Sequence, residues 1–299
     1  MNSKYVSFMA MLILSALFIS CLSEGEDPNK DLNNELKTID NYLTASGAST
    51  DDIVYDNSSG IRFYFLGYGN GIVPRDGQKV NYTVTGSILT SIGPSAPFIN
   101  TSESDDLEDI TPAGLQYALR SMLEGSAALV YVPSRYAYGA KGEPTLGIPA
   151  NAIIEYRITL DEVERTSTQQ SRFEQDTTAI KDFFVLKSIE DVVEHESGLF
   201  YTVDVSASGQ SPKPYNPVTF EYKLRTLASP DNVIESSTLS NVIPFGLIDG
   251  LKIGLQEMSV GETYTFYIPS GMAYGPTASG QIPANANLIF EIKLTAAGK

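Results

Sequence analysis

The chain has 299 residues, of which 42% are hydrophobic, and it carries 17 Tyr and 13 Phe. This length allows about two domains of roughly 150 residues each, and the composition is that of a chain that buries a core. The formal net charge of -16, from 36 acidic and 20 basic residues, argues against a nucleic-acid-binding protein, because phosphate binding needs clustered Lys and Arg.

The N-terminus predicts a secretion signal. An apolar run extends from Phe8 to Ile19, and its length of about 12 residues is too short for a membrane-spanning helix of roughly 20 residues. The stretch LFISC that ends at Cys21 resembles a bacterial lipobox. This resemblance implies removal of a signal peptide of residues 1–20, a lipid on Cys21, and a tether of residues 21–30. Cys21 is the only cysteine, so no internal disulfide is expected.

The rest of the chain repeats itself. The phrase Ile-Pro-Ala-Asn-Ala begins at Ile148 and again at Ile282, 134 positions later (282 minus 148). Two further pairs keep the same order, namely Ser59-Gly60 with Ser197-Gly198 and Tyr138-Gly139 with Tyr274-Gly275. Repeated landmarks in a conserved order predict one structural module present twice.

Each copy predicts the same elements in chain order. A leading helix is indicated by apolar residues at i, i+3 and i+4, which are Ile39, Tyr42 and Leu43 in the first copy and Ile180, Phe183 and Phe184 in the second. An alternating strand follows, with Val80, Tyr82 and Val84 on one face, and with Val218, Phe220, Tyr222 and Leu224 in the second copy.

A short helix and a final strand complete each copy. The helix has the apolar stripe Leu115, Leu119 and Met122, or Leu251, Leu255 and Met258, and the strand alternates through Ile154, Tyr156 and Ile158, or Leu288, Phe290 and Ile292. A short helix against a mostly antiparallel sheet is an α+β arrangement. We expect domains at residues 31–165 and 171–299, each with its leading helix, joined by the polar stretch from Thr166 to Ser171.

The order of these motifs resembles the FKBP-type peptidyl-prolyl isomerases, twice over. The resemblance is carried by LQEMSVGETYTFYIPSGMAYG and QIPANANLIFEIKL in the second copy, and it covers roughly residues 60–163 and 198–294. It implies two FKBP-like domains, each an antiparallel β-sheet wrapped around a short α-helix with an aromatic pocket between them.

The resemblance also implies site residues in the second copy. The catalytic positions would be Tyr222, Glu235, Ile248, Tyr274 and Phe290, and the substrate-binding positions would be Ile234, Leu247, Leu251 and Ile282. Two positions depart from the family pattern: Leu251 replaces the Trp of the pocket floor, and Glu235 replaces an Asp. The chain has no Trp at all, so we expect a shallower floor that is still apolar.

The first copy departs further and is expected to hold a degenerate site. Its corresponding positions would be Tyr82, Ile99, Asn100, Pro112, Leu115, Tyr138, Ile148 and Tyr156. Asn100 would replace the carboxylate, and Pro112 would fall where the family donates a backbone N–H, which proline lacks. The sequence Thr111-Pro112 is also typical of an ordinary helix start, with the Thr111 hydroxyl as the cap.

The implied reaction needs neither a nucleophile, a metal nor a cofactor, because rotation about an Xaa-Pro bond makes and breaks no bond. His195 is the only histidine, and its charged neighbours favour a solvated position over a catalytic triad. The acidic run from Glu103 to Asp109 lacks the spaced ligands of an EF-hand loop. We interpret that run as a flexible acidic loop.

The sequence therefore predicts a prolyl isomerase that acts mainly through its second domain on proline-containing polypeptides outside the cytoplasm. It is expected to be a monomer anchored by lipid to the outer membrane of a bacterial envelope, facing the periplasm or the outside. Two alternatives remain open. One is a non-catalytic module or chaperone that binds proline segments with eroded FKBP folds, and the other is a component of a surface assembly with both domains as spacers.

Overall fold

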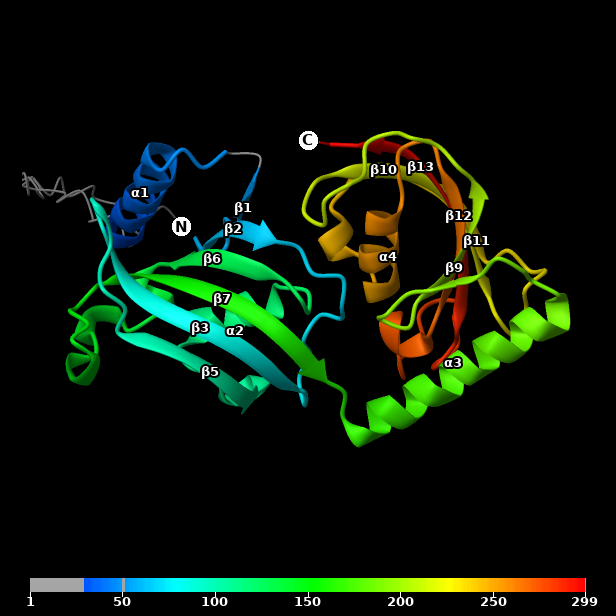
Figure 1. Cartoon of the computed structure of the whole chain (residues 1–299), viewed down its shortest axis with the longest axis horizontal. Helices are drawn as coiled ribbons and strands as arrows, with labels where there is room; N and C mark the ends of the chain where they lie inside the picture. The colour runs from blue at the N-terminus through cyan, green and yellow to red at the C-terminus, as the bar shows by residue number, and fades with distance from the viewer. Residues whose placement is uncertain (1–29, 50–51, 299) are drawn as a thin grey trace, which may run out of the picture.

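The computed structural model describes residues 30–49 and 52–298. The expected signal peptide, the lipidated Cys21 and all but the last residue of the expected tether lie outside these residues. The described residues form two antiparallel sheets, each accompanied by a leading helix and a short helix (Figure 1). The predicted α+β class, with an antiparallel sheet and a short helix present twice, is therefore confirmed. No helix in the described part of the chain combines the length and the apolar character needed to cross a bilayer.

The first domain begins with the leading helix α1 (Lys30–Ala45). Its sheet has the order β1-β2-β6-β7-β3-β4, with β5 paired to β3. The strands are β1 (Ile53–Tyr55), β2 (Arg62–Gly67), β3 (Lys79–Thr90), β4 (Gly93–Pro94), β5 (Ile99–Asp106), β6 (Ala127–Val132) and β7 (Ile153–Glu164), and the short helix is α2 (Ala113–Arg120).

The second domain repeats this plan after the leading helix α3 (Ser167–Lys187). Its sheet has the order β11-β10-β13-β12-β9-β8. The strands are β8 (Val193–Glu194), β9 (Phe200–Val205), β10 (Val218–Thr226), β11 (Glu235–Val242), β12 (Thr263–Ile268) and β13 (Leu288–Ala297), and the short helix is α4 (Asp249–Gly254).

Each sheet packs one face on its short helix and the other on its leading helix. In the last strand of the second domain, Phe290 belongs to the core with α4, whereas its neighbour Ile289 packs with Ile180 and Phe184 of α3. The first domain repeats this division, with Ile39 and Leu43 of α1 buried against Ile153. Neighbouring residues of a strand point to opposite faces, so both faces of each sheet are covered. The predicted helix stripes and strand alternations are confirmed by this burial.

The expected linker is wrong, because its residues begin α3. Thr166 caps the helix: its hydroxyl accepts from the Gln169 N–H at 3.2 Å, and the Gln169 side chain accepts from the Thr166 N–H at 2.9 Å. This reciprocal pair is a capping box. Only Arg165 lies between the end of β7 and this cap. A polar composition was compatible with both a linker and a capped helix start, and the hydrogen bonds decide for the helix.

The expected flexible loop at Glu103 to Asp109 is also wrong. These residues form the end of β5 and a turn of 3-10 helix at Leu107–Asp109. Leu107 is fully buried in the core of the first domain, and the Glu108 carboxylate accepts from the Gly77 N–H at 2.6 Å. Glu103, Asp106 and Glu108 are exposed, whereas Asp105 is half-buried and accepts from the Tyr82 hydroxyl at 2.9 Å. The run is therefore an ordered sheet edge, which composition alone did not reveal.

An aromatic stack joins the two domains. Tyr215, from the loop before β10, packs on Phe65 of the first domain with ring centroids 4.4 Å apart and on Phe245 of the second domain at 4.8 Å. Its hydroxyl donates to the Ser121 carbonyl at 2.7 Å. Burial raises the pKa of Tyr215 well above its ordinary value. The ring therefore sits in a dry contact that holds the domains in one arrangement.

Two ion pairs reinforce this contact. Arg75 lies 2.8 Å from the Asp249 carboxylate at the start of α4, and Lys213 lies 2.6 Å from Asp52. Asp249 is nearly fully buried and also accepts from Lys252 at 2.8 Å. Phe245 and Asp249 flank Ile248 along the chain, so the first domain supports the second close to a predicted site residue.

We expect Tyr215→Ala to lower the free energy of unfolding by about 3 kcal/mol, because a partly buried aromatic side chain is removed from a packed contact. Calorimetry of the full chain measures this. The matched control Tyr215→Phe keeps both ring contacts and loses only the hydrogen bond to Ser121, so a loss of about 1 kcal/mol is expected. Equal effects of the two variants would contradict a stabilising role for the ring stack.

Candidate active site

The second domain brings its predicted apolar site residues together in one cluster. Tyr222 of β10 and Phe290 of β13 lie on neighbouring strands, with ring centroids 5.9 Å apart. Leu251 of α4 and Ile282 of the loop between β12 and β13 belong to the same core cluster. All four side chains are buried. They form an apolar floor because alternate residues of the curled sheet face the short helix.

The rim of this floor is partly exposed. Ile234, Leu247 and Ile248 are half-buried against the core cluster, and 38% of Tyr274 is exposed. Tyr274 lies close enough to Tyr222 to contribute to the raised pKa of the Tyr222 hydroxyl. A cavity of about 400 Å³ begins next to this rim, at Asp249 and Gly275, and neither Tyr274 nor Phe290 lines it. The floor itself is filled by its own side chains.

A tyrosine and a carboxylate form the polar side of the cluster. The Tyr222 hydroxyl donates to Glu235 Oε1 at 2.5 Å. Burial first, and then this hydrogen bond, raise the pKa of Tyr222 to about 12. The carboxylate of Glu235 is exposed on its other side, so it can hold the Tyr222 ring in place while remaining in contact with solvent.

Ile248 offers a backbone donor at the edge of the cluster. It is the N-cap of α4, with φ -64° and ψ 151°, and its carbonyl accepts from the N–H groups of Leu251 and Lys252 at 2.9 and 3.0 Å. Within the described residues, no hydrogen bond uses the Ile248 N–H itself. Helix starts leave such N–H groups without intrahelical partners, so this one is available to a bound carbonyl.

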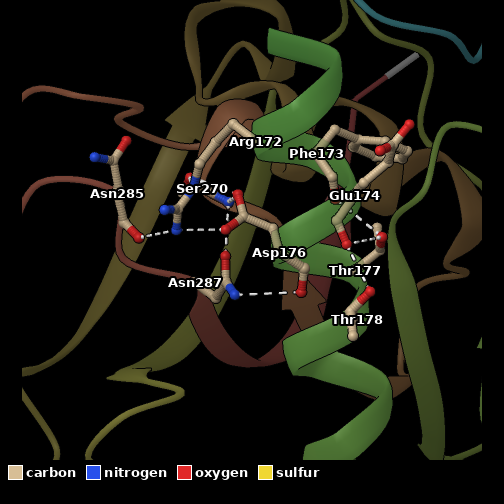
Figure 2. Close-up of polar contacts among 9 residues, drawn as sticks. All are labelled: Arg172, Phe173, Glu174, Asp176, Thr177, Thr178, Ser270, Asn285 and Asn287. Atoms are coloured by element: carbon tan, nitrogen blue, oxygen red, sulfur yellow. Dashed lines mark hydrogen bonds and ion pairs between the residues drawn. The ribbon is translucent and has the colours of Figure 1, made fainter. Parts of the chain in front are cut away.

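The loop that carries Tyr274 is anchored to the leading helix through a buried carboxylate (Figure 2). Asp176 of α3 is 1% exposed, and its Oδ2 accepts from the Ser270 N–H at 2.9 Å and from the Ser270 hydroxyl at 2.5 Å. Arg172, one turn earlier, lies 2.5 Å from Asp176 Oδ1 and donates to the Asn285 carbonyl at 2.8 Å.

The other end of this loop is held in the same network. Asn287 accepts from the Ser270 N–H at 3.0 Å and donates to the Asp176 carbonyl at 3.4 Å. Within the loop, the Asn285 N–H donates to the Gly275 carbonyl at 2.7 Å. Both ends of the segment that contains Tyr274 and Ile282 are thus fixed to α3, so the leading helix positions the rim of the site.

The first domain uses a similar anchor. Glu35 of α1 accepts from the Ser134 N–H at 2.7 Å and from the Ser134 hydroxyl at 2.6 Å. Ser134 lies before Tyr138 as Ser270 lies before Tyr274. Both leading helices therefore hold the Tyr-Gly loop of their own domain through a carboxylate and a serine.

The strand register of the first domain differs from the expectation. In each domain the strand pair with the last strand, β3–β7 or β10–β13, has one shift in its register. The shift comes just before Tyr82, which pairs with Leu160, and just before Phe220, which pairs with Leu294. Tyr82 thus corresponds to Phe220, and Val84 corresponds to Tyr222. The expected equivalence of Tyr82 and Tyr222 is wrong by two residues. Tyr82 instead donates to Asp105 Oδ2 at 2.9 Å.

The expected positions of Ile99 and Asn100 are wrong by one residue. The Phe98 N–H donates to the Gly86 carbonyl at 2.9 Å, just as the Ile234 N–H donates to the Leu224 carbonyl at 2.8 Å. Phe98 therefore takes the place of Ile234, and Ile99 takes the place of Glu235. Asn100 accepts from the Thr85 hydroxyl at 3.1 Å and lies on the outer face, because Thr85 stands between the inward-facing Val84 and Gly86.

Sequence reasoning thus missed Val84 and Phe98, although the sequence held a signal. The distances between matched landmarks fall along the chain, from 138 at Ser59 (197 minus 59) to 136 at Tyr138 (274 minus 138). Matching Tyr82 with Tyr222 requires 140 (222 minus 82), which breaks this trend, whereas Val84 gives 138 (222 minus 84).

The other predicted residues of the first domain do come together. Leu115, Ile148 and Tyr156 are buried in one core cluster, and Tyr138 packs against it and contacts Phe98 edge-on at 6.1 Å. Burial raises the pKa of Tyr156, which places a hydroxyl where the second domain has Phe290. The Tyr138 hydroxyl contributes to this raised pKa, but no hydrogen bond of good geometry to a described residue satisfies the Tyr156 hydroxyl.

Pro112 occupies the position of Ile248. The Pro112 carbonyl accepts from the Leu115 N–H at 2.9 Å, as the Ile248 carbonyl accepts from the Leu251 N–H. Pro112 is itself the N-cap of α2, and no side chain caps this helix, so the expected Thr111 cap is wrong. The first domain has no N–H to offer at this position.

The expectation of a solvated His195 is also wrong. The side chain is 9% exposed, and its Nδ1 lies 3.1 Å from the donating N–H of Ser197 and 2.8 Å from the Ser197 hydroxyl. Its Nε2 lies 3.7 Å from Glu257 Oε1 and 3.5 Å from the amide nitrogen of Asn70, across the domain interface. His195 closes a turn beside that interface and lies outside the aromatic cluster.

We expect Asp176→Asn to lower the free energy of unfolding by about 3 kcal/mol, because it leaves Arg172 without its buried partner. Hydrogen exchange of residues 273–287 should become faster, since the loop loses its anchor. The matched control is Glu174→Gln on the exposed side of the same helix, where a change within about 0.5 kcal/mol is expected. Unchanged exchange in the loop would contradict an anchoring role for Asp176.

The raised pKa of Tyr222 gives a pH dependence with a defined sign. A folded-state pKa of about 12 against an ordinary value of about 10 means that folding favours the neutral phenol. This contribution to stability is fully present below pH 10 and is lost as the pH rises from about 10 to 12. Ultraviolet titration of the phenol measures it, with Tyr222→Phe to identify the signal. A Tyr222 pKa of 10 in the folded protein would contradict the buried hydrogen bond.

Comparison with known proteins agrees with this geometry. The profile of the family described as "FKBP-type peptidyl-prolyl cis-trans isomerase" matches residues 71–161 and 208–295, which together are more than half of the chain. A protein of Aeromonas hydrophila named "FKBP-type peptidyl-prolyl cis-trans isomerase FkpA" is 37% identical over 113 residues, covering 37% of this chain and 42% of the relative.

Other similar proteins carry related names. The "Outer membrane protein MIP" of Legionella longbeachae is 30% identical over 152 residues, covering 46% of this chain and 62% of the relative. The crystal structure of FkpA from Escherichia coli aligns with a TM-score of 0.37 at 23% identity, over 46% of this chain and 62% of that chain. The chain spans less than two thirds of the length of these relatives. By the double family match, the chain belongs to the FKBP-type peptidyl-prolyl cis-trans isomerase family, with the family domain present twice.

Proposed function

We propose that this protein catalyses the cis-trans isomerisation of Xaa-Pro peptide bonds and that its second domain carries the activity. Membership in the isomerase family supports the reaction. The observation that carries the proposal is the cluster of Tyr222, Leu251 and Phe290 next to the unused N–H of Ile248.

The reaction is a rotation, so the site must favour a twisted amide over a planar one. Resonance in the peptide bond gives a barrier of about 18–20 kcal/mol, and uncatalysed isomerisation takes tens to hundreds of seconds. In the twisted state the nitrogen lone pair no longer overlaps with the carbonyl, so the amide is less polar. A surface that excludes water therefore destabilises the planar amide relative to the twisted one.

The apolar floor of the second domain supplies such a surface. Tyr222, Leu251, Ile282 and Phe290 are all buried in it, and a proline ring placed on the floor would lose its contact with water. Removing only ~4 kcal/mol from the barrier would accelerate the rotation by about three powers of ten. No covalent intermediate is needed for this.

Backbone and hydroxyl donors would hold the two ends of the substrate. The Ile248 N–H stands free at the N-cap of α4 and would donate to a substrate carbonyl. The partly exposed hydroxyl of Tyr274 would donate to another. Glu235 would orient Tyr222 through their 2.5 Å hydrogen bond. These roles are proposed for Tyr222, Glu235, Ile248, Tyr274 and Phe290, with Ile234, Leu247, Leu251 and Ile282 as binding surface.

The first domain lacks several of these groups, which favours the second as the active one. Pro112 has no N–H, and Val84 and Ile99 stand at the positions of Tyr222 and Glu235 in the strand register. Tyr156 adds a buried hydroxyl without a partner among the described residues. The first domain still has an apolar cluster of Leu115, Tyr138 and Ile148, which favours binding of proline segments without catalysis as its own role.

The clients are proposed to be polypeptides outside the cytoplasm. The N-terminal apolar run and the lipobox-like stretch that ends at Cys21 support a lipid anchor in a bacterial envelope. The name of the relative MIP as an outer membrane protein supports the same location. The acidic net charge of -16 favours a soluble surface without nucleic acid.

Domain-specific variants of the full chain test this proposal. Isomerisation of a short Xaa-Pro peptide is measured by a protease-coupled assay. We expect Tyr274→Ala to lower kcat/KM far more than the matched Tyr138→Ala, because only the second domain combines the floor with a donor. Equal losses would show that the active domain is assigned wrongly. If the unmodified chain does not accelerate the reaction over buffer, the protein is a non-catalytic module that binds proline segments.

A second variant isolates the backbone donor. Ile248 has φ -64°, which suits proline, so Ile248→Pro removes the N–H with little backbone strain. A fall in kcat/KM of about tenfold is expected from the loss of one hydrogen bond. The control Ile248→Ala removes the side chain and keeps the N–H.

A further inference from the structure

A cavity of about 400 Å³ lies where the first domain, the start of α3 and the second domain meet. Its walls are mostly apolar and include Ile72 from the first domain, Phe173 from α3 and Met272 from the second domain. Three arginines also line it: Arg75, Arg165 and Arg172. A chain of strongly negative net charge thus gathers cations around one apolar hollow.

Two of these arginines are neutralised by the protein itself. Arg75 pairs with Asp249 at 2.8 Å, and Arg172 pairs with Asp176 at 2.5 Å. Asp176 balances the charge of Arg172, whereas Asp249 is shared between Arg75 and Lys252, which lies 2.8 Å from its other oxygen.

Arg165 is not neutralised in this way. Its guanidinium lies over the Phe173 ring at 4.1 Å and donates to the Ser197 carbonyl at 3.2 Å. Among the described residues, no carboxylate lies within ion-pair distance of it. The Glu124 carboxylate attracts the guanidinium only over a distance longer than an ion pair. This carboxylate accepts hydrogen bonds from the N–H groups of Ile72 and Val163 at 3.3 and 3.2 Å. Burial lowers the pKa of Arg165, as expected for a cation that lacks a counter-ion.

The cavity adjoins the groups that would hold the substrate. Asp249, in its wall, directly follows Ile248, and Gly275 and Pro276 directly follow Tyr274. Consecutive Cα atoms are about 3.8 Å apart. The segments that carry the proposed donors therefore also form part of the cavity wall.

We propose that this cavity is a second binding subsite for the client polypeptide, which takes an apolar side chain of the segment next to the proline together with a carboxylate that pairs with Arg165. This inference rests on the proposed function for the position of the proline. The apolar walls fit an aliphatic side chain, and a carboxylate on Arg165 gains charge-assisted hydrogen bonds in a place shielded from water. The site would therefore prefer client segments that have an acidic residue next to the proline.

The test uses the full chain and fluorescein-labelled octapeptides with a central Ala-Pro. Two peptides carry Leu-Glu directly before or directly after the Ala-Pro, and each has a twin with Leu-Gln. Fluorescence anisotropy measures their affinities. We expect at least one acidic peptide to bind about tenfold more tightly than its Gln twin. Equal affinities within both pairs would overturn the proposal.

Variants then place the effect at the cavity. Arg165→Gln should abolish the preference for Glu, and Thr168→Trp, which fills the cavity from α3 without changing its charge, should weaken all four peptides. The matched control is Arg135→Gln, an exposed arginine outside the cavity, which should keep the preference. A preference that survives both Arg165→Gln and Thr168→Trp would overturn the proposal, and the melting temperature of each variant confirms folding.

Two further measurements separate this proposal from the catalytic one. Isomerisation of a tetrapeptide too short to reach the cavity should change less than twofold in Arg165→Gln. If the chain fails to accelerate that reaction but keeps the Arg165-dependent binding, the proposed activity fails and the subsite stands. If dodecanoate binds with the same dependence on Arg165 while the acidic peptides do not, the cavity is a site for a small amphiphilic acid and the proposal is overturned.

Discussion

A carboxylate that reaches from a leading helix to a serine holds the rim of each site in place, and it is fully buried in the second domain and half-buried in the first. Asp176 binds both the N–H and the hydroxyl of Ser270, and Glu35 does the same for Ser134. Hydrogen bonds to a charged group are stronger than neutral ones, and a buried carboxylate is costly unless it is paired with a cation and hydrogen-bonded. The carboxylate can bind the serine and also keep its own charge balanced only when helix, loop and sheet adopt one geometry. The leading helices are therefore part of the site's support, although neither contributes a residue to the aromatic cluster itself.

Much of the fold was predictable because hydrophobic alternation repeats through both copies. The strand of Leu288, Phe290 and Ile292 and the helix of Leu251 and Leu255 were predicted from their periods alone. The register of Tyr82 was not, because a shift of two residues keeps a strand's side chains on the same face, and each copy has its tyrosine at a different one of the two positions. The start of α3 was missed because Thr166 and Gln169 act through a hydrogen-bond pair that composition does not report. His195 was misplaced because its charged neighbours point elsewhere.

The two domains contribute differently to one site. In the second domain Phe245 and Asp249 stand on either side of Ile248 and are held by Tyr215 and Arg75 at the domain interface. The first domain thus contributes to the stability of the loop that offers the proposed donor, whatever its own activity. The first domain, which has Pro112 at the position of Ile248, still has a well-packed core and presents an ordered surface to its neighbour.

The junction at Arg165 has a consequence for how the protein withstands degradation. Proteases cut extended, exposed segments that can enter their clefts, and a single residue between β7 and the capped start of α3 offers none. Cleavage there requires prior unwinding of a helix whose first turns carry Arg172 and Asp176. The folded protein is thereby protected from proteolytic cleavage at the junction between its two domains.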